Sequence, residues 1–374
     1  MHLVFIFTYG YSLKTWFESG TIEKEIEVYK QLVQEHNFKI TFVTYGDDSE
    51  LEFANLLNKI QIFPIYKYFN YSKFSIIRYV KSFFIPFLMK KTINEVDIIK
   101  QNQLMGSWVS IIYKILIKKP LIIRTGYDML FFSLKEDKGL LKNFLYSLLT
   151  NLSLKFSSMY TVTSQADKLF LEERFGTGVE VRVRPNWIYL SSNTLSKNRF
   201  DKKILCVGRI EKQKNYLSLI KNLEHSEFDL DIVGTGSLES EIIKLAKDLK
   251  VEINLLGSVS NKELLDMYTK YKYFILASHF EGNPKVVLEA MSKGCVPILS
   301  DIPNHIELIE HNISGILFDP LKMELTTHLE KLNANIVLWT EISSRAAEKV
   351  NKTNSLKTAI SNDLLDYKLL ASNT

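Results

Sequence analysis

Residues 271–300 read YKYFILASHFEGNPKVVLEAMSKGCVPILS, and this stretch decides the fold. It opens with an apolar run, Tyr273–Ala277, whose length and aromatic and β-branched content are typical of a buried strand. A second run of this kind, Val296–Leu299, follows after enough chain for one helix. Two buried strands joined by a helix form a β-α-β unit, whose strands lie parallel. The sequence therefore predicts an α/β protein built on parallel sheet.

The segment between these strands predicts a helix and a ligand-binding strand end. Asn283 is suited to cap the helix, Pro284 to occupy its first position, and Gly294 to follow its last turn. Ligands of open parallel sheets bind beyond the carboxyl ends of the strands, which is where we expect Glu281. Glu289 is expected inside the helix, roughly 8–9 Å from its start. The two carboxylates can therefore reach different parts of one ligand, with helix N–H groups suited to an anion between them.

The letters around these glutamates carry a family resemblance. EGNPKVVLEAMSKGCVP, residues 281–297, closely resembles the signature of the retaining GT-B glycosyltransferases with an E-x7-E motif, the group 1 or family 4 type. The resemblance extends over about 203–320 and implies two Rossmann-like domains that face each other across a cleft. Without it, Glu281 would be interpreted as a solvated loop residue and Glu289 as a surface helix residue.

The resemblance also implies which residues act on the donor. In the family, an arginine after a strand-ending glycine and a lysine five residues later clamp the donor diphosphate, and Gly208, Arg209 and Lys214 match them. Preorganised cations stabilise the charge that gathers on a departing diphosphate. Taken singly, each cation could equally be a solvated loop residue, and Asn215 stands where the family often has glycine. Glu281, Arg209 and Lys214 are the expected catalytic residues.

The expected donor site combines three segments of the second half of the chain. The loop at 208–214 holds the diphosphate, the turn at 257–259 surrounds the nucleobase, and 281–289 contact the sugar and the ribose. The expected donor-binding residues are Gly208, Arg209, Lys214, Gly257, Ser258, Val259, Glu281, Gly282, Asn283, Pro284, Lys285 and Glu289.

The first half predicts a second Rossmann-like domain. A strand at His2–Thr8, a loop to Gly20, a helix from Thr21 and a strand at Phe38–Thr44 suit such a half. The family has two glycines at this helix start, whereas here Thr21 follows Gly20. Arg124 lies near the end of a later strand, where related enzymes often carry a histidine that faces the donor. It could occupy that location, be an acceptor contact or be an ordinary loop arginine. Gly20, Thr21 and Arg124 are the expected acceptor-side residues.

These features divide the chain into three parts. Residues 1–190 are expected to form an acceptor-binding domain, 200–354 a nucleotide-sugar-binding domain, and 355–374 a helix that returns to the first domain, as in the family. The polar segment 191–199 is the expected linker. Serine with an acid three residues later predicts helix starts at Ser164 and Ser260.

Composition is that of a globular protein, with 46% hydrophobic and 24% charged residues. Cys206 and Cys295 both lie in apolar segments, where packing is the expected role, and a reducing cytoplasmic compartment fits them. The N-terminus lacks the basic start and cleavage site of a signal peptide. No apolar run has the length of a membrane span.

Positive charge is concentrated in one region of the first half. Residues 61–166 contain 15 Lys and Arg against 5 Asp and Glu, and 61–94 and 140–156 contain no acid. Aromatic residues are interleaved with the cations of 61–94, a pattern that can lie on an anionic membrane surface. The alternative is a helix pair packed on the sheet with its lysines in solvent. Nucleic acid is the weakest alternative, because no recognised nucleic-acid module accompanies the stretch.

We therefore expect a metal-independent, retaining hexosyltransferase that moves a sugar from a nucleotide diphosphate sugar of the UDP or GDP type. The acceptor would be a lipid-linked or surface-polysaccharide intermediate, with the enzyme cytoplasmic and peripheral on the inner face of the cell membrane. No cofactor and no nucleic-acid partner are expected. Asp229-Leu230-Asp231 has D-x-D spacing but opens a strand, so we reject it as a metal site. The alternatives are a nucleotide-sugar epimerase on the same fold and a non-catalytic donor-binding subunit.

Overall fold

The computed structural model describes residues 1–372 except 127, 177, 179 and 190–197. The chain folds into two compact units. Unit 1 comprises Met1–Arg184 and Ala359–Thr374, and unit 2 comprises Pro185–Thr358. Most of the expected linker, 191–199, lies outside the described residues. The functions expected of the two domains stay predictions.

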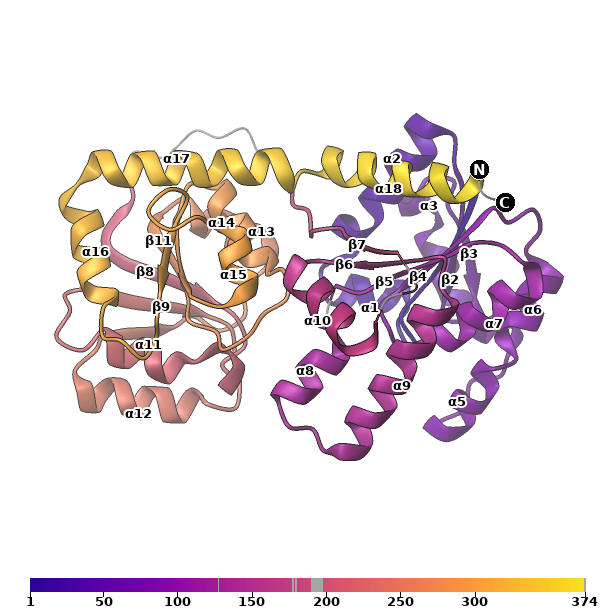
Figure 1. Ribbon diagram of the computed structural model, residues 1–374, viewed down its shortest axis with the longest axis horizontal. Helices are drawn as coiled ribbons and strands as arrows, with labels where there is room; N and C mark the ends of the chain where they lie inside the picture. The colour runs from indigo at the N-terminus through magenta and orange to yellow at the C-terminus, as the bar shows by residue number, and fades with distance from the viewer. Residues whose placement is uncertain (127, 177, 179, 190–197, 373–374) are drawn as a thin grey trace. The chain divides into compact units, whose positions relative to one another are not determined.

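Unit 1 is built on a seven-stranded parallel sheet (Figure 1). The strand order is β3-β2-β1-β4-β5-β6-β7, so the order reverses between β1 and β4. Every residue of β1 is buried, as expected for a strand covered by helices on both faces. The strands are β1 (His2–Ile6), β2 (Lys39–Thr44), β3 (Gln61–Pro64), β4 (Ile98–Asn102), β5 (Leu121–Arg124), β6 (Met159–Val162) and β7 (Val181–Val183).

The helices of unit 1 include one that the sequence analysis missed. The predicted loop to Gly20 contains α1, which Ser12 caps by accepting a hydrogen bond from the backbone N–H of Thr15. The elements are α1 (Leu13–Glu18), α2 (Ile22–His36), η1 (Asp48–Phe53), α3 (Ala54–Leu57), α4 (Ile65–Tyr68), α5 (Ser75–Ser82), α6 (Ile85–Thr92), α7 (Ser107–Ile117), α8 (Met129–Lys135), α9 (Leu140–Phe156), α10 (Gln165–Phe175) and, from Ala359 onward, α18 (Leu356–Ser372).

The last helix of the chain, α18, is fixed to the first sheet by buried charges. Lys100 of β4 donates to Asp363 Oδ2 at 2.7 Å and to the Tyr367 hydroxyl at 2.8 Å. Asp366, also on α18, accepts hydrogen bonds from Arg182 of the edge strand β7 and from Arg184, just after that strand. Burial lowers the pKa of the Lys100 ammonium. Because removing one partner of a buried pair is costly, this network anchors α18 in one position.

Unit 2 is built on a six-stranded parallel sheet of order β10-β9-β8-β11-β12-β13. Its order reverses between β8 and β11, just as that of the first sheet reverses between β1 and β4. The strands are β8 (Phe200–Val207), β9 (Asp229–Val233), β10 (Ile253–Leu255), β11 (Tyr271–Leu276), β12 (Val296–Ser300) and β13 (Ile316–Phe318). The predicted β-α-β unit is present as β11, α14 and β12.

The helices of unit 2 cover this sheet, and α13 begins as the sequence predicts. Ser260 and Glu263 form the predicted capping box of α13, and in unit 1 Ser164 caps α10. The elements are η2 (Lys212–Lys214), α11 (Tyr216–Asn222), α12 (Glu239–Leu249), α13 (Asn261–Tyr268), α14 (Lys285–Ser292), α15 (Pro303–Leu308), α16 (Leu325–Ala334) and α17 (Ile336–Thr353).

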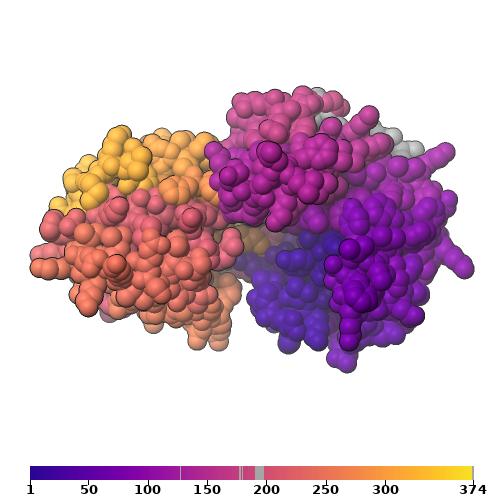
Figure 2. All heavy atoms as spheres, turned by 90° about the horizontal axis from the view of Figure 1, so that it is seen from below, coloured from indigo at the N-terminus to yellow at the C-terminus, as the bar shows by residue number. Residues whose placement is uncertain are grey.

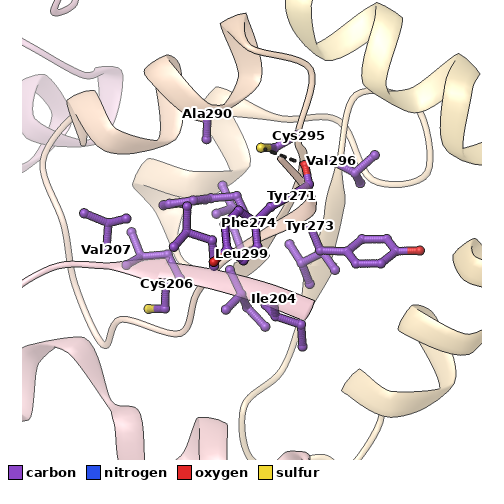
Figure 3. Packing of buried hydrophobic residues seen from close by; sticks show 14 of the residues in the cluster. Ile204, Cys206, Val207, Tyr271, Tyr273, Phe274, Ala290, Cys295, Val296 and Leu299 are labelled. Atoms are coloured by element: carbon purple, nitrogen blue, oxygen red, sulfur yellow. Dashed lines mark hydrogen bonds between the residues drawn. The ribbon is translucent and has the colours of Figure 1, made fainter. Parts of the chain in front are cut away.

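The core of unit 2 lies around β8, β11 and β12 (Figure 3). Phe274 and Leu299 are fully buried between these strands and α14. Cys206 and Cys295 are both buried and free, and they lie apart in this core (Figure 3). The Cys295 thiol donates to the backbone oxygen of Tyr268 at 3.1 Å. Within the described part of the chain, no helix combines the length and apolar content that crossing a bilayer requires.

Candidate functional site

The candidate site lies where the strand order of unit 2 reverses. The central strands β8 and β11 run parallel, with Ile204 beside Tyr273 and Cys206 beside Ile275. Their carboxyl ends therefore lie side by side, at the position where open parallel sheets bind ligands. One end continues into the loop 208–214 and the other into the loop 277–284.

Two hydrogen bonds clip these two loops together. Gln213 in η2 is buried, and its Nε2 donates to the backbone oxygen of Phe280 at 2.9 Å. In return, the backbone N–H of His279 donates to the Gln213 backbone oxygen at 2.9 Å. Asn215 follows with φ 54° and ψ 40°, a left-handed conformation that asparagine tolerates better than most residues. The asparagine can therefore occupy a position that the family often fills with glycine.

Two glycines after β9, Gly234 and Gly236, pack closely against the backbone of the 208–211 loop. Gly234 has φ +137°, and a Cβ there would lie 2.1 Å from the backbone oxygen of Gly208. A Cβ on Gly236 would lie 2.3 Å from the backbone oxygen of Ile210. The Gly-Thr-Gly sequence after β9 therefore serves close packing of two backbones. Ser237 extends the contact, since its N–H and hydroxyl both donate to the Glu211 carboxylate.

At the centre of the site, Lys214 and Glu281 form an ion pair. Lys214 Nζ lies 2.5 Å from Glu281 Oε1, and both side chains are largely buried. The Ser278 hydroxyl donates to the same carboxylate oxygen at 2.6 Å. Gly208 leaves room for the lysine, because a Cβ there would lie 2.9 Å from Lys214 Cε. Arg209 is exposed beside this pair in sequence, so the site holds one engaged and one accessible cation.

A buried histidine, His305, interacts electrostatically with the Lys214–Glu281 pair. His305 of α15 is fully buried, and its Nδ1 lies 2.9 Å from the backbone oxygen of Ser300. Burial lowers the pKa of the His305 imidazole to about 4, opposed by the charge of Glu281 and reinforced by that of Lys214. The Ser300 hydroxyl in turn donates to the Ser278 backbone oxygen at 2.7 Å. The imidazole is therefore neutral near pH 7.

The helix after Glu281 begins one residue later than predicted. Pro284 is the N-cap residue, with extended backbone at ψ 112°, and α14 starts at Lys285. The prediction of Asn283 as N-cap is therefore wrong. The side-chain oxygen of Asn283 instead accepts from the backbone N–H of Asn186, whose side chain donates to the Asn283 backbone oxygen at 2.7 Å.

This shift leaves the start of α14 without a side-chain cap within the described residues. The positive end of the helix dipole therefore remains suited to an anion. Glu289 is the fifth residue of α14, about 6 Å along the axis from Lys285 and thus closer to the helix start than predicted. It is buried, like Glu281.

The remaining expected residues lie in separate places. The turn Gly257–Val259 follows β10, and the Gly257 backbone oxygen accepts from the Gly234 N–H at 2.8 Å, which joins this turn to the loop after β9. In unit 1, Gly20 and Thr21 lie between α1 and α2. Gly20 has φ +66°, whereas Thr21 has φ −103°, which any residue adopts. Its replacement of a family glycine therefore causes no backbone strain. Arg124 ends β5 and is half-buried.

Sequence reasoning missed three residues that build the site: Gln213, Ser278 and His305. Ser278 follows the β11 strand directly, which is a signal for a ligand-side position. Gln213 and His305 carry no comparable signal, because their roles depend on contacts between loops that are distant in sequence.

Comparisons with known proteins match the segment that carries this site. Residues 191–348 match the family model described as glycosyl transferases group 1. An amylovoran biosynthesis glycosyltransferase of Erwinia amylovora is 25% identical over 300 residues, 76% of this chain and 78% of that protein. An N-acetylgalactosaminyltransferase of Campylobacter jejuni, named for a diphospho-undecaprenol acceptor, is 36% identical over 105 residues, 27% of this chain and 28% of that protein.

Solved structures match over nearly the whole chain. Sucrose-phosphate synthase of Thermosynechococcus elongatus has a TM-score of 0.77 at 11% identity and covers 100% of both chains. The Anabaena protein Alr3699/HepE, solved with UDP and glucose, has a TM-score of 0.72 at 16% identity over 98% of this chain and 99% of that one. The chain spans 54%, 28% and 32% of the length of three curated relatives. The protein therefore has the GT-B fold, and its residues 191–348 match the family model of the glycosyl transferases group 1.

Proposed function

We propose that this protein transfers a hexose from a nucleotide diphosphate sugar, of the UDP or GDP type, to an acceptor hydroxyl with retention of anomeric configuration. The observation that carries the proposal is the buried Lys214–Glu281 pair at the carboxyl ends of β8 and β11. This pair lies within the segment that matches the group 1 family. A cation and an anion held together at a strand-order reversal suit a ligand that has both an anionic diphosphate and a polyhydroxylated sugar.

Each side chain has a proposed role. Arg209, Lys214 and the start of α14 hold the diphosphate, since arginine offers a fork, lysine a point charge and the helix its N–H groups. Glu281 accepts hydrogen bonds from the sugar hydroxyls. Glu289 binds the ribose hydroxyls. The proposed contacts to the base are backbone groups of the turn 257–259.

The proposed reaction takes place on one face of the sugar. The bond between the anomeric carbon and the phosphate oxygen breaks, and the acceptor oxygen bonds to the same face of that carbon. The acceptor proton passes to the departing phosphate oxygen, so no protein base is required. Lys214 and Arg209 stabilise the charge that develops on the diphosphate, an interaction that is stronger in the transition state than in the ground state. These cations supply the electrostatic role that a metal ion would otherwise fill.

The proposed acceptor is a lipid-linked or surface-polysaccharide intermediate on the cytoplasmic face of a membrane. Relatives are named for transfer to a diphospho-undecaprenol and a diphosphopolyprenol glycan and for amylovoran biosynthesis. Gly20, Thr21 and Arg124 of unit 1 are the proposed acceptor-side residues. The rival functions, a nucleotide-sugar epimerase and a non-catalytic donor-binding subunit, would share the donor site but release no sugar to an acceptor.

A ligand screen followed by an activity assay tests the proposal. A nucleotide diphosphate that binds only the folded protein raises the melting temperature, with about 2.7 kcal/mol of stabilisation at a hundred times its Kd. We expect UDP or GDP to stabilise the wild type and Lys212→Ala, an exposed neighbour in η2, but to stabilise Lys214→Ala much less. Radiolabelled sugar should then transfer to a polyprenyl-diphosphate glycan. Nucleotide binding with an epimerised product, or with no transfer to a panel of glycan acceptors, would favour a rival.

A further inference from the structure

Helices α5 and α6 of unit 1 present a row of large apolar side chains to solvent. Ile76, Val80, Phe84 and Phe87 follow one another at spacings of three or four residues, and Ile76 is 76% exposed. Ile76 and Val80 lie one turn apart on α5, and Phe84 and Phe87 lie at the start of α6. Single exposed apolar residues are ordinary, but a contiguous row of this kind marks an interaction surface.

Helix α9 carries a second row. Leu141, Leu145, Leu148 and Leu152 recur at helical spacing, with Phe144 beside them, and all five are exposed; Leu141 is 72% exposed. Its opposite side is buried through Ser153 and Leu154. The helix therefore presents five large apolar side chains to solvent, whereas an ordinary surface helix turns such residues toward the core.

The helices α5 and α9, which carry these side chains, are both hydrogen-bonded to the first turn of α7. The Trp108 indole N–H donates to the Ser82 hydroxyl of α5 at 2.8 Å, and its ring packs on Tyr79 and Phe83. Next to it, the Ser107 hydroxyl accepts from Ser153 of α9 at 2.9 Å. In Figure 1, α5 and α9 project from the same side of unit 1, and Figure 2 looks onto that side. We call the solvent-facing side chains of residues 73–92, which include α5 and α6, and of α9 the α5–α9 face.

The charges of this face are positive. Lys73, Lys90, Lys91, Lys142 and Lys155 are exposed, and 61–94 and 139–166 contain no Asp or Glu. Three other cations of the basic stretch make contacts within the protein. Arg78 and Lys81 donate to backbone oxygens of the preceding loop, and Lys67 pairs with Asp48 at 3.2 Å. Lys67 belongs to the basic sequence stretch but lies in α4, so it is not part of the α5–α9 face.

We propose that the α5–α9 face docks on the surface of a bilayer that contains anionic phospholipids. Leucines and phenylalanines would enter the interface between headgroups and acyl chains, and the lysines would contact lipid phosphates. The alternative occupant, a second copy of the chain, is disfavoured by charge. A two-fold contact places the same surface on both subunits, so lysines would meet lysines. An anionic bilayer instead supplies the opposite charge along with an apolar layer.

Vesicle flotation with the full-length chain tests the docking. At about 0.05 M salt we expect the protein to float with phosphatidylcholine vesicles that contain roughly one third phosphatidylglycerol, and not with pure phosphatidylcholine. Raising the salt to about 0.5 M should release most of it, because the attraction is screened. Changing Lys73, Lys90, Lys142 and Lys155 together to Gln should lower the vesicle partition coefficient at least tenfold, since each cation near an anionic surface contributes about fivefold.

Two further variants separate the contributions. Leu141→Ser with Phe144→Ser and Leu148→Ser should weaken binding tenfold or more without lowering the melting temperature, because the removed side chains are exposed. The matched control changes exposed residues of unit 2, Lys244 and Lys247 to Gln with Ile336 and Val337 to Ser, and should bind as the wild type does. Lys214→Ala should also bind normally, which keeps this test independent of the proposed sugar transfer.

The outcomes are decisive in both directions. No flotation with anionic vesicles at low salt overturns the proposal, as does wild-type binding by the four-lysine variant. Concentration-dependent dimerisation that the leucine variant abolishes, in the absence of vesicle binding, would assign the face to a second copy.

Discussion

The two sheets of this protein have the same order over six strands, to which unit 1 adds β7, but they differ in what lies at the point of reversal. In unit 2, the ends of β8 and β11 bring together Lys214 and Glu281. In unit 1, the corresponding ends of β1 and β4 carry a neutral arrangement. There the buried Gln101 side chain donates to the Asn102 backbone oxygen at 3.0 Å, and the Thr8 hydroxyl donates to that same oxygen.

The buried charges of unit 1 lie elsewhere, between the sheet and α18. Lys100 and Asp363 fasten a helix to the sheet, whereas Lys214 and Glu281 lie between two loops at a strand end. The same kind of pair therefore has two uses. The Lys100–Asp363 pair stabilises the fold. The Lys214–Glu281 pair lies where a bound ligand can replace one member of the pair. The difference predicts that breaking the first changes stability and breaking the second changes turnover.

The largest effect on turnover is expected from the cations of the loop that follows β8 in unit 2. Lys214→Ala and Arg209→Ala should each lower kcat by about 10²–10³-fold, because in the proposed mechanism each removes a cation that stabilises the leaving diphosphate. Lys212→Ala, in the same η2 segment, is the control and should retain normal turnover. Steady-state sugar transfer measures the effect. Wild-type kcat in both Lys214→Ala and Arg209→Ala would remove these residues from the mechanism.

Removing the Lys100–Asp363 ion pair of unit 1 should change stability but not turnover. Asp363→Asn leaves the buried Lys100 ammonium with only part of its contacts, at a cost of roughly 2–4 kcal/mol. We place the cost below that of the deepest pairs because the Asp363 side chain is 20% exposed. Hydrogen exchange of α18 amides should accelerate, while kcat per folded molecule stays unchanged. Lys368→Met, an exposed change on the same helix, should alter neither quantity. Unchanged protection of α18 in Asp363→Asn would show that the pair does not hold the helix.

A smaller, pH-dependent effect is expected from His305. Its folded pKa of about 4 lies below the unfolded value of 6.5. The imidazole therefore contributes its full stability above pH 6.5, and this contribution is lost as the pH falls, because the unfolded state binds the proton first. Between pH 6.5 and 5, the wild type should lose about 2 kcal/mol more than His305→Asn. Hydrogen exchange of β8 and β11 at the two pH values measures this difference, and parallel losses in both proteins would contradict it.

The smallest expected effect is that of metal removal. EDTA should leave sugar transfer unchanged, because Arg209, Lys214 and the start of α14 already supply positive charge to the diphosphate. Loss of activity in EDTA that magnesium or manganese restores would show that these cations do not suffice.

The β-α-β unit and the two sheets could be predicted because apolar runs and capping residues are local signals. Ser260 with Glu263 gave the start of α13 correctly. The start of α14 was misplaced because Asn283 bonds to Asn186, nearly a hundred residues away. Helix α1 was missed because its cap pairs Ser12 with Thr15 in place of the usual acid.

The limits are similar at the site. Lys214 and Glu281 could be identified through a family pattern, but their mutual contact could not, because it joins loops that follow different strands. His305 illustrates the same limit, since the influence of Glu281 and Lys214 on its pKa depends on where the loops after β8 and β11 lie. The apolar rows of α5 and α9 were visible as composition only, and which of their side chains reach solvent depends on how the helices attach to α7.

The placement of α18 has a consequence for biosynthesis. Unit 2 is one continuous segment, Pro185–Thr358, whereas unit 1 needs residues from both ends of the chain. While the chain emerges from the ribosome, Lys100 has no Asp363 to pair with, and Asp366 is not yet available to Arg182 and Arg184. Domains generally complete their folding in the order of synthesis. In this protein all residues of unit 2 are synthesised before the last residues of unit 1. Unit 1 can therefore complete its fold only after α18 has left the ribosome.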